Sequence, residues 1–219
     1  MHSEFIVPFI HFLGMLLLIT SFGIIASPLI SACVRFYAMH SFLLSLITLA
    51  IAYHYNVWHL VIAAVLTFLL KVVAIPQIFF TMIRRLGIRK EVESYINIPF
   101  SLFLAVLLVL VSFYVTAGGK AFKILSSWEF FPIAISTVFL GMLVMTTRKK
   151  AITQVLGLLL LENGLFLMGV TMTFGMPLLV ELGILFDVLV GIIMMGIFIF
   201  KIRDAFEGID VDNMTVLKG

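Results

Sequence analysis

The chain has 219 residues, of which 63% are hydrophobic and only 11% are charged, with a net charge of +3 and a mean hydropathy of +1.25. Soluble domains have roughly 45–50% apolar and about 25% charged residues, so this composition excludes a water-soluble globular domain. In lipid the backbone must satisfy its own hydrogen bonds, which leaves helices or closed barrels. Because the apolar runs are long and continuous, the sequence predicts an all-α polytopic membrane protein.

Seven apolar segments are long enough to cross a bilayer, which takes about 20 residues. In chain order the predicted spans are Phe5–Ala26, Phe36–Tyr53, Trp58–Ile83, Ile96–Thr116, Phe130–Thr146, Ala151–Thr173 and Pro177–Ile202. The loops between them are too short for a soluble catalytic domain. We therefore expect a single membrane domain over 1–219, made of a three-helix unit (1–95), two further helices (96–147), the helices of 148–203 and a polar tail (204–219).

The basic residues are unevenly distributed between the loops. If the seven spans alternate in direction, eleven of the fourteen lysines and arginines fall on one side, Lys120 and Lys123 fall on the other, and Lys71 lies within a span. An excess of Lys and Arg marks the cytoplasmic side. The sequence thus predicts a multi-pass protein of the inner (plasma) membrane with its N-terminus outside and its C-terminus in the cytoplasm.

Motifs for catalysis and metal binding are missing from the sequence. Cys33 is the single cysteine, so neither a disulfide framework nor a cysteine-ligated metal centre can form. No HExxH motif, phosphate-binding loop or dinucleotide fingerprint occurs. The first residues lack the basic region of a signal peptide, so we expect the first apolar run to be retained. We expect no cofactor, no metal and no redox centre in this chain, which would not be an enzyme by itself.

Three ionisable residues on different spans are predicted at similar depth in the bilayer. At 1.5 Å per residue, Glu162 lies about 18 Å past the cytoplasmic end of its span, Asp187 about 15 Å past the outer end of its span, and Lys71 about 20 Å inside its own. An ionisable group at the bilayer centre costs roughly 2.5–3.5 kcal/mol on insertion scales. Groups that are retained at such a cost mark ion or proton pathways.

Further polar residues are expected to support these three groups. Glu181, about 6 Å from the outer end of its span, and His40, about 7 Å from the cytoplasmic end of its own, are candidate entry and exit points. Ser41, Ser45 and Thr48 share one face of the second span, and Thr67 lies one turn before Lys71. Gly183 and Gly191 flank Asp187 at spacings of four residues, and Pro76 is expected to open the third span beside Lys71. Burial disfavours the charged form of both acids and lysines, so such a group can gain or lose a proton near neutral pH. Two alternatives are a static ion pair of Lys71 with Glu162, and a packing role for His40 and His11.

The second half of the chain resembles hydrogenase-4 component E. The likeness is carried by residues 161–165 (Leu-Glu-Asn-Gly-Leu), 180–187 (Val-Glu-Leu-Gly-Ile-Leu-Phe-Asp) and 209–219 (Ile-Asp-Val-Asp-Asn-Met-Thr-Val-Leu-Lys-Gly). The first half fits through residues 35–37 (Arg-Phe-Tyr), which open the second span, and through Lys71. The likeness covers nearly the whole chain in length, span number and chain end. This family belongs to the membrane arm of formate-hydrogenlyase and related group 4 nickel-iron hydrogenases.

A wider resemblance runs from about Arg148 to the C-terminus. It is to the K component of respiratory complex I and to the C component of multisubunit cation/proton antiporters, which have three spans with a membrane glutamate in each of the last two. Glu162 falls at the first glutamate, and Asp187 falls near the second, one methylene shorter, with Glu181 as the alternative. The resemblance implies that 148–203 are helices like those of the complex I component.

The resemblance implies a non-catalytic membrane subunit that takes part in proton or sodium translocation coupled to electron transfer. The proton relay would comprise Glu162, Asp187, Lys71, Glu181 and His40. The implied partners are antiporter-like and quinone-module-like membrane subunits, peripheral nickel-iron and iron–sulfur subunits, and membrane lipid, but no nucleic acid. The alternatives are a subunit of a multisubunit cation/proton antiporter, a purely structural membrane-arm subunit, and an autonomous transporter or seven-helix receptor.

Overall fold

The computed structural model describes residues 3–85, 92–117 and 130–173, together with Gly183 and Gly191. All elements of the described residues are helices, so the predicted all-α class is confirmed. In chain order they are α1 (Ser3–Ala26), α2 (Ile30–Tyr55), α3 (Trp58–Thr67), η1 (Phe68–Ala74), α4 (Ile75–Arg85), α5 (Ile98–Ala117), α6 (Phe131–Thr147) and α7 (Ala151–Thr173). The segments α3, η1 and α4 follow one another without a break and form one long helix.

Five helices of the described residues are long and apolar enough to cross a membrane. They are Pro8–Ala26, Ile30–Tyr55, Trp58–Arg84, Ile98–Ala117 and Ala151–Met172, and Phe131–Thr147 is a shorter apolar helix. These six helices correspond to the first six predicted spans. The seventh predicted span, Pro177–Ile202, and the tail lie outside the described residues apart from two glycines. The count of seven and the orientation in the membrane therefore stay predictions.

The second predicted span began too late. Helix α2 starts at Ile30, six residues before the predicted start at Phe36. The prediction placed Arg35 in a loop, but this residue lies on an exposed part of the helix, where its Nε donates to the carbonyl of Ser31 at 3.3 Å. A long basic side chain can remain on a helix near the membrane surface by extending its charged end toward water.

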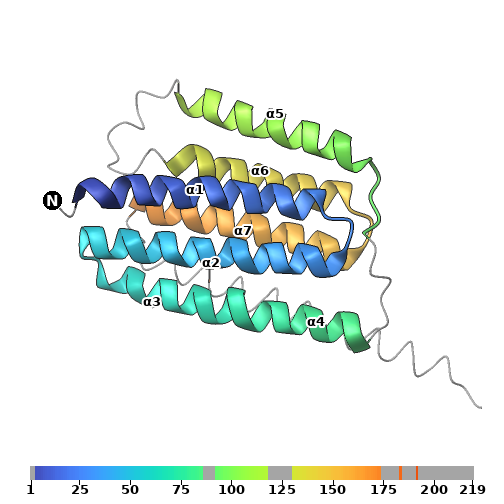
Figure 1. The fold of residues 1–219 in the computed structure, drawn as a ribbon, viewed down its shortest axis with the longest axis horizontal. Coiled ribbons are helices and arrows are strands. Elements are labelled where there is room, and N and C mark those ends of the chain that lie inside the picture. The colour runs from blue at the N-terminus through green and yellow to red at the C-terminus, as the bar shows by residue number, and fades with distance from the viewer. Residues whose placement is uncertain (1–2, 86–91, 118–129, 174–182, 184–190, 192–219) are drawn as a thin grey trace, which may run out of the picture.

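The helices pack side by side as a bundle (Figure 1). Helix α2 is central, since it contacts α1, the continuous helix formed by α3, η1 and α4, and also α7. Helix α7 packs mainly on α6, and α5 packs on α6 and α1 at the edge of the bundle. Successive helices run in opposite directions, so that the α1–α2 and α6–α7 connections lie at the same end (Figure 1).

Glycines bring α6 and α7 into close contact. A Cβ atom at Gly164 of α7 would lie 2.7 Å from the backbone nitrogen of Val138, and one at Gly157 would lie 2.7 Å from that of Met145. No side chain larger than hydrogen fits at these distances, and small residues of this kind allow close packing of helices in membranes. The contact fixes the rotation of α7, and with it the direction in which its polar residues point.

A buried arginine joins three segments at the end of the bundle where α1 ends. The sequence placed Arg148 with the cytoplasmic basic residues, but its side chain is only 3% exposed. Its guanidinium donates to the Ile25 carbonyl at 2.7 Å, at the C-terminus of α1, and to the Ser94 hydroxyl at 2.7 Å. Burial lowers the pKa of this guanidinium from its ordinary value. Arg148 therefore satisfies a carbonyl that the end of a helix leaves without an intrahelical partner.

A polar layer with a buried ion pair as the candidate functional site

A layer of polar side chains crosses the middle of the bundle. It separates two apolar clusters, of which one contains Ile30, Phe79 and Leu156 and the other contains Leu17, Leu44 and Leu167. We call this set of buried residues the polar layer: Thr20 and Ser21 of α1, His40 and Ser41 of α2, Thr67 of α3, Lys71 of η1, Ser136 and Thr137 of α6, and Glu162 and Asn163 of α7. Buried polar groups require hydrogen-bond partners, so the contacts within this layer decide what it can do.

Lys71 and Glu162 form an ion pair at the centre of the polar layer. The ammonium Nζ of Lys71 lies 2.7 Å from Oε1 of Glu162, and the two residues are only 2% and 4% exposed. Lys71 is thirteen residues from either end of the span Trp58–Arg84, and Glu162 is near the middle of Ala151–Met172. The structure thus brings together two of the three residues that the sequence predicted at similar depth. Their role in proton transfer stays a prediction.

Asn163 extends the ion pair to α2. Its Oδ1 accepts a hydrogen bond from Lys71 Nζ at 3.0 Å, and its Nδ2 donates to the hydroxyl of Ser41 at 3.0 Å. The ammonium can only donate, so this contact also fixes the orientation of the amide. Sequence reasoning did not select Asn163 as a site residue. The available signal was an uncharged amide next to a buried acid in an otherwise apolar helix.

The backbone around Lys71 is a π-helix, which is wider than an α-helix. At its end the N–H of Ile75 donates to the carbonyl of Leu70, five residues earlier. Pro76 follows directly, and a proline has no N–H to donate and clashes with the carbonyl four residues before it. The expected opening of this span beside Lys71 is therefore present. Short π-helical turns are frequent at functional sites, and this one places Lys71 toward α7.

His40 is held between α1 and α2. Its Nδ1 lies 3.2 Å from the carbonyl oxygen of Leu17 and 3.2 Å from the hydroxyl oxygens of both Thr20 and Ser21. The ring is fully buried. The sequence predicted His40 about 7 Å from the end of its span, which is wrong because α2 begins at Ile30. His40 lies ten residues into the helix, about 15 Å along it, within the polar layer.

The remaining predicted site residues have other positions. Asp187 and Glu181 lie outside the described residues. His11 of α1 stacks on the ring of Phe130 with a centroid distance of 4.7 Å, as expected for a packing residue. Ser45 and Thr48 share the predicted face with Ser41, but their hydroxyls donate to backbone carbonyls instead of joining the ion pair.

One neighbour connects the ion pair with the predicted seventh span. The ring of Phe166, four residues after Glu162, has its centroid 5.9 Å from Lys71 Nζ. A Cβ atom at Gly183 would lie 3.7 Å from a carbon of the same ring, so Gly183 lies beside Phe166. The phenyl ring is therefore close to both the Lys71 ammonium and Gly183.

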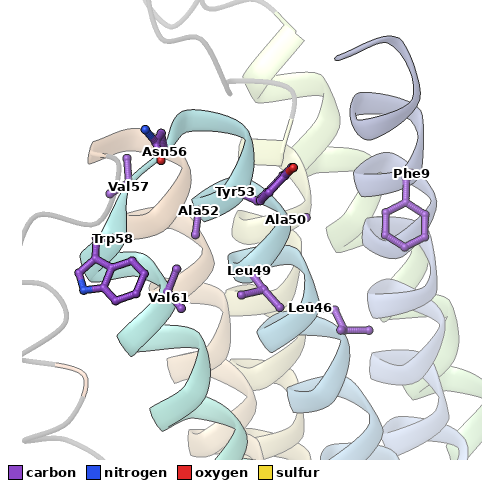
Figure 2. Close-up of a pocket in the computed structure, with 10 residues that line it drawn as sticks. All are labelled: Phe9, Leu46, Leu49, Ala50, Ala52, Tyr53, Asn56, Val57, Trp58 and Val61. Atoms are coloured by element: carbon purple, nitrogen blue, oxygen red, sulfur yellow. The ribbon is translucent and has the colours of Figure 1, made fainter. Parts of the chain in front are cut away.

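A surface cavity lies away from the ion pair. It has a volume of about 640 Å³ and lies between the beginnings of α1 and α3 and the end of α2 (Figure 2). Its lining residues are Phe9, Leu46, Leu49, Ala50, Ala52, Tyr53, Asn56, Val57, Trp58 and Val61. None of them belongs to the polar layer. In the part of the chain that the structure describes, no cluster of three or more His, Cys, Asp or Glu residues could hold a metal ion.

The fold and the site define a multi-pass helical membrane protein with an ion pair buried between its helices. The chain is 26% identical over 204 residues to hydrogenase-4 component E of Escherichia coli, a match that covers 93% of this chain and 94% of that protein. The match to hydrogenase-4 component E of Shigella flexneri has the same identity and extent. The chain is thus a homologue of hydrogenase-4 component E, which confirms the resemblance seen in the sequence.

The chain also matches part of a second curated protein. The chain is 32% identical over 130 residues to an uncharacterized protein of Mycobacterium tuberculosis. This match spans 59% of the chain and 59% of the length of the mycobacterial protein. No protein-family model and no solved structure matches the chain.

Proposed function

We propose that this chain is a non-catalytic membrane subunit of a complex I-like hydrogenase, in which it takes part in proton translocation coupled to electron transfer. The observation that carries the proposal is the buried contact of 2.7 Å between Lys71 and Glu162. The homology to hydrogenase-4 component E supports the setting in a multisubunit hydrogenase complex. In that setting nickel-iron and iron–sulfur chemistry would take place on peripheral partner subunits.

The cost of the ion pair supports a functional role. Removing two charges from water costs several kcal/mol for each ion, and a hydrophobic pair of similar volume is often as stable or more stable. Ionisable residues within membrane spans typically mark ion or proton pathways. A pair that served only to join η1 with α7 could therefore be replaced by apolar residues with little loss.

The geometry of the pair permits a simple proton exchange. A proton that moves from Lys71 Nζ to Glu162 Oε1 along their hydrogen bond converts the ammonium and the carboxylate into a neutral amine and a neutral acid. Because the two groups interact strongly, the protonation of one changes the proton affinity of the other. The pair can thus store a proton and release it when a neighbouring charge in the complex changes.

The second relay acid is proposed to come from the predicted seventh span. Asp187 lies four residues after Gly183, and Gly183 lies beside Phe166 at the ion pair. Glu181 precedes Gly183 by two residues and is the alternative. The membrane partners of such a relay would be antiporter-like and quinone-module-like subunits.

The test is a comparison of electron transfer with proton movement in the intact complex. The substitution Glu162→Gln keeps the size and polarity of the side chain but removes the titratable group. We expect this complex to assemble and to lose proton uptake into inverted membrane vesicles. Leu165→Ala, at an exposed position of α7, is the control.

Each outcome separates the proposal from an alternative. Full proton uptake in the assembled Glu162→Gln complex would overturn the relay and leave a purely structural subunit. Uptake that depends on sodium and is abolished by a sodium ionophore, but not by a protonophore, would replace the proton by sodium. Transport by the purified chain alone in vesicles would instead indicate an autonomous transporter.

A further inference from the structure

The contacts of His40 define which of its ring nitrogens carries the proton. The Leu17 carbonyl can only accept a hydrogen bond, and it lies 3.2 Å from Nδ1. The hydroxyls of Thr20 and Ser21 donate their own protons to this same carbonyl, at 2.7 Å and 3.0 Å. All three groups around Nδ1 therefore present acceptor oxygens to it. In the neutral ring the proton must be on Nδ1, which leaves the basic lone pair on Nε2.

The other ring nitrogen is buried without a hydrogen-bond partner among the described residues. Nε2 of His40 is inaccessible to solvent, and no donor of the described part of the chain reaches it. A buried acceptor without a donor is costly, and such groups in a native fold require an explanation. The orientation of the ring is not accidental, because three contacts at Nδ1 hold it in place. The fold thus holds a basic nitrogen inside the polar layer.

His40 is linked to the ion pair through Ser41, its neighbour in the chain. The next residue, Ser41, accepts a hydrogen bond from Asn163, which in turn accepts one from Lys71. Among the residues of the polar layer, the groups other than His40 that can carry charge are Lys71 of η1 and its partner Glu162 of α7.

We propose that His40 is a second protonation site of the relay, which accepts a proton at Nε2 when Lys71 becomes neutral. In the balanced step, an ammonium at Lys71 and a neutral imidazole at His40 become an amine and an imidazolium, and no other bond changes. A second positive charge in the same buried layer is unfavourable, so a single proton alternates between the two groups. This inference rests on the proposed function, since it extends the relay from the ion pair to His40 of α2, where α2 packs on α1.

Two substitutions at His40 separate proton transfer from packing. In His40→Asn the amide nitrogen occupies the position of Nδ1, so the contact with Leu17 survives while Nε2 is lost. In His40→Gln the amide occupies the position of Nε2, and the contact at Nδ1 is lost. We expect the Asn variant to assemble at the wild-type level but to lose proton uptake at least about tenfold. His54→Asn, near the end of α2, is the matched control and should leave uptake unchanged.

The comparison with Glu162→Gln distinguishes the failure of this inference from the failure of the proposed function. If His40→Asn retains full proton uptake while Glu162→Gln loses it, the relay stands and the role of His40 is overturned. If both variants retain uptake, the relay itself fails. If His40→Asn does not assemble, nitrogen-15 NMR spectra of the histidine-labelled wild-type chain within its complex provide the test, because they show which ring nitrogen of His40 carries the proton. A neutral His40 with its proton on Nδ1 supports the proposal, and a proton on Nε2 overturns it.

Discussion

Lys71 and Glu162 are 91 residues apart in the chain, yet their side chains meet at 2.7 Å in the interior of the bundle. Three local features produce this contact. The π-helical turn before Pro76 places Lys71 toward α7. Glycines of α7 pack closely against α6 and so fix the rotation of α7. Asn163 accepts the second hydrogen bond from the Lys71 ammonium. The contact is therefore a property of the whole bundle, and its removal should be measurable in stability as well as in activity.

Replacement of one partner of the ion pair by an apolar side chain should destabilise the protein strongly. Lys71→Met leaves the Glu162 carboxylate buried without its counter-ion, and this situation typically costs about 3–5 kcal/mol. The double variant Lys71→Met/Glu162→Met should recover most of that stability, because two apolar side chains of similar length fill the same space. Thermal unfolding of the detergent-solubilised protein measures both effects. A double variant that is no more stable than Lys71→Met would contradict this prediction.

Loss of the Asn163 amide should weaken the site without breaking the ion pair. Asn163→Ala removes one acceptor from Lys71 and the donor to Ser41, and hydrogen bonds to charged groups contribute about 1.5–3 kcal/mol. We expect a loss of stability in this range and a proton uptake below that of the wild type. Ser41→Ala removes only the outer hydrogen bond and should cost less, about 0.5–1.5 kcal/mol. A larger effect of Ser41→Ala would contradict this order of contacts.

The depth of the ion pair was predictable from the sequence, but the contact itself was not. Counting residues from the ends of an apolar run gives the depth of Lys71 and Glu162 in the membrane. Which side of each helix faces the bundle is decided by tertiary packing, and the apolar spans carry no periodic pattern that reveals it. The place of His40 was wrong because Arg35 was assigned to a loop, which shortened α2 by six residues at its start. Asn163 was missed because an amide carries no charge and so lacks the insertion cost that marks an acid.

The close contact of α6 with α7 should tolerate no side chain at its glycines. Gly164→Ala places a methyl group 2.7 Å from the backbone nitrogen of Val138, which cannot move aside as a flexible side chain would. Overpacking of this kind costs about 1–3 kcal/mol and should also rotate α7 away from Lys71. We expect less assembled complex and less proton uptake in membranes. Gly183→Ala, whose methyl group would make an ordinary contact of 3.7 Å with Phe166, is the control and should assemble normally.

The guanidinium of Arg148 should be needed for its shape as well as its charge. One of its nitrogens donates to Ser94 and another to the Ile25 carbonyl, both at 2.7 Å, so the planar group joins two segments. Lysine keeps the positive charge but offers a single compact ammonium, which cannot reach both acceptors in this geometry. We expect Arg148→Lys to lower stability by about 1.5–3 kcal/mol in thermal unfolding, close to the effect of Arg148→Gln.

The neighbouring residue provides the control for charge alone. Lys149 is exposed, and its ammonium lies 5.2 Å from the ring centroid of Tyr95, so Lys149→Gln should change stability by less than about 1 kcal/mol. Burial lowers the pKa of Arg148, but an arginine side chain stays protonated at neutral pH, so its contribution should not change between pH 6 and 8. If the Arg148→Lys variant were as stable as the wild type, the positive charge, and not the two directed hydrogen bonds, would hold α1 to the connection between α6 and α7.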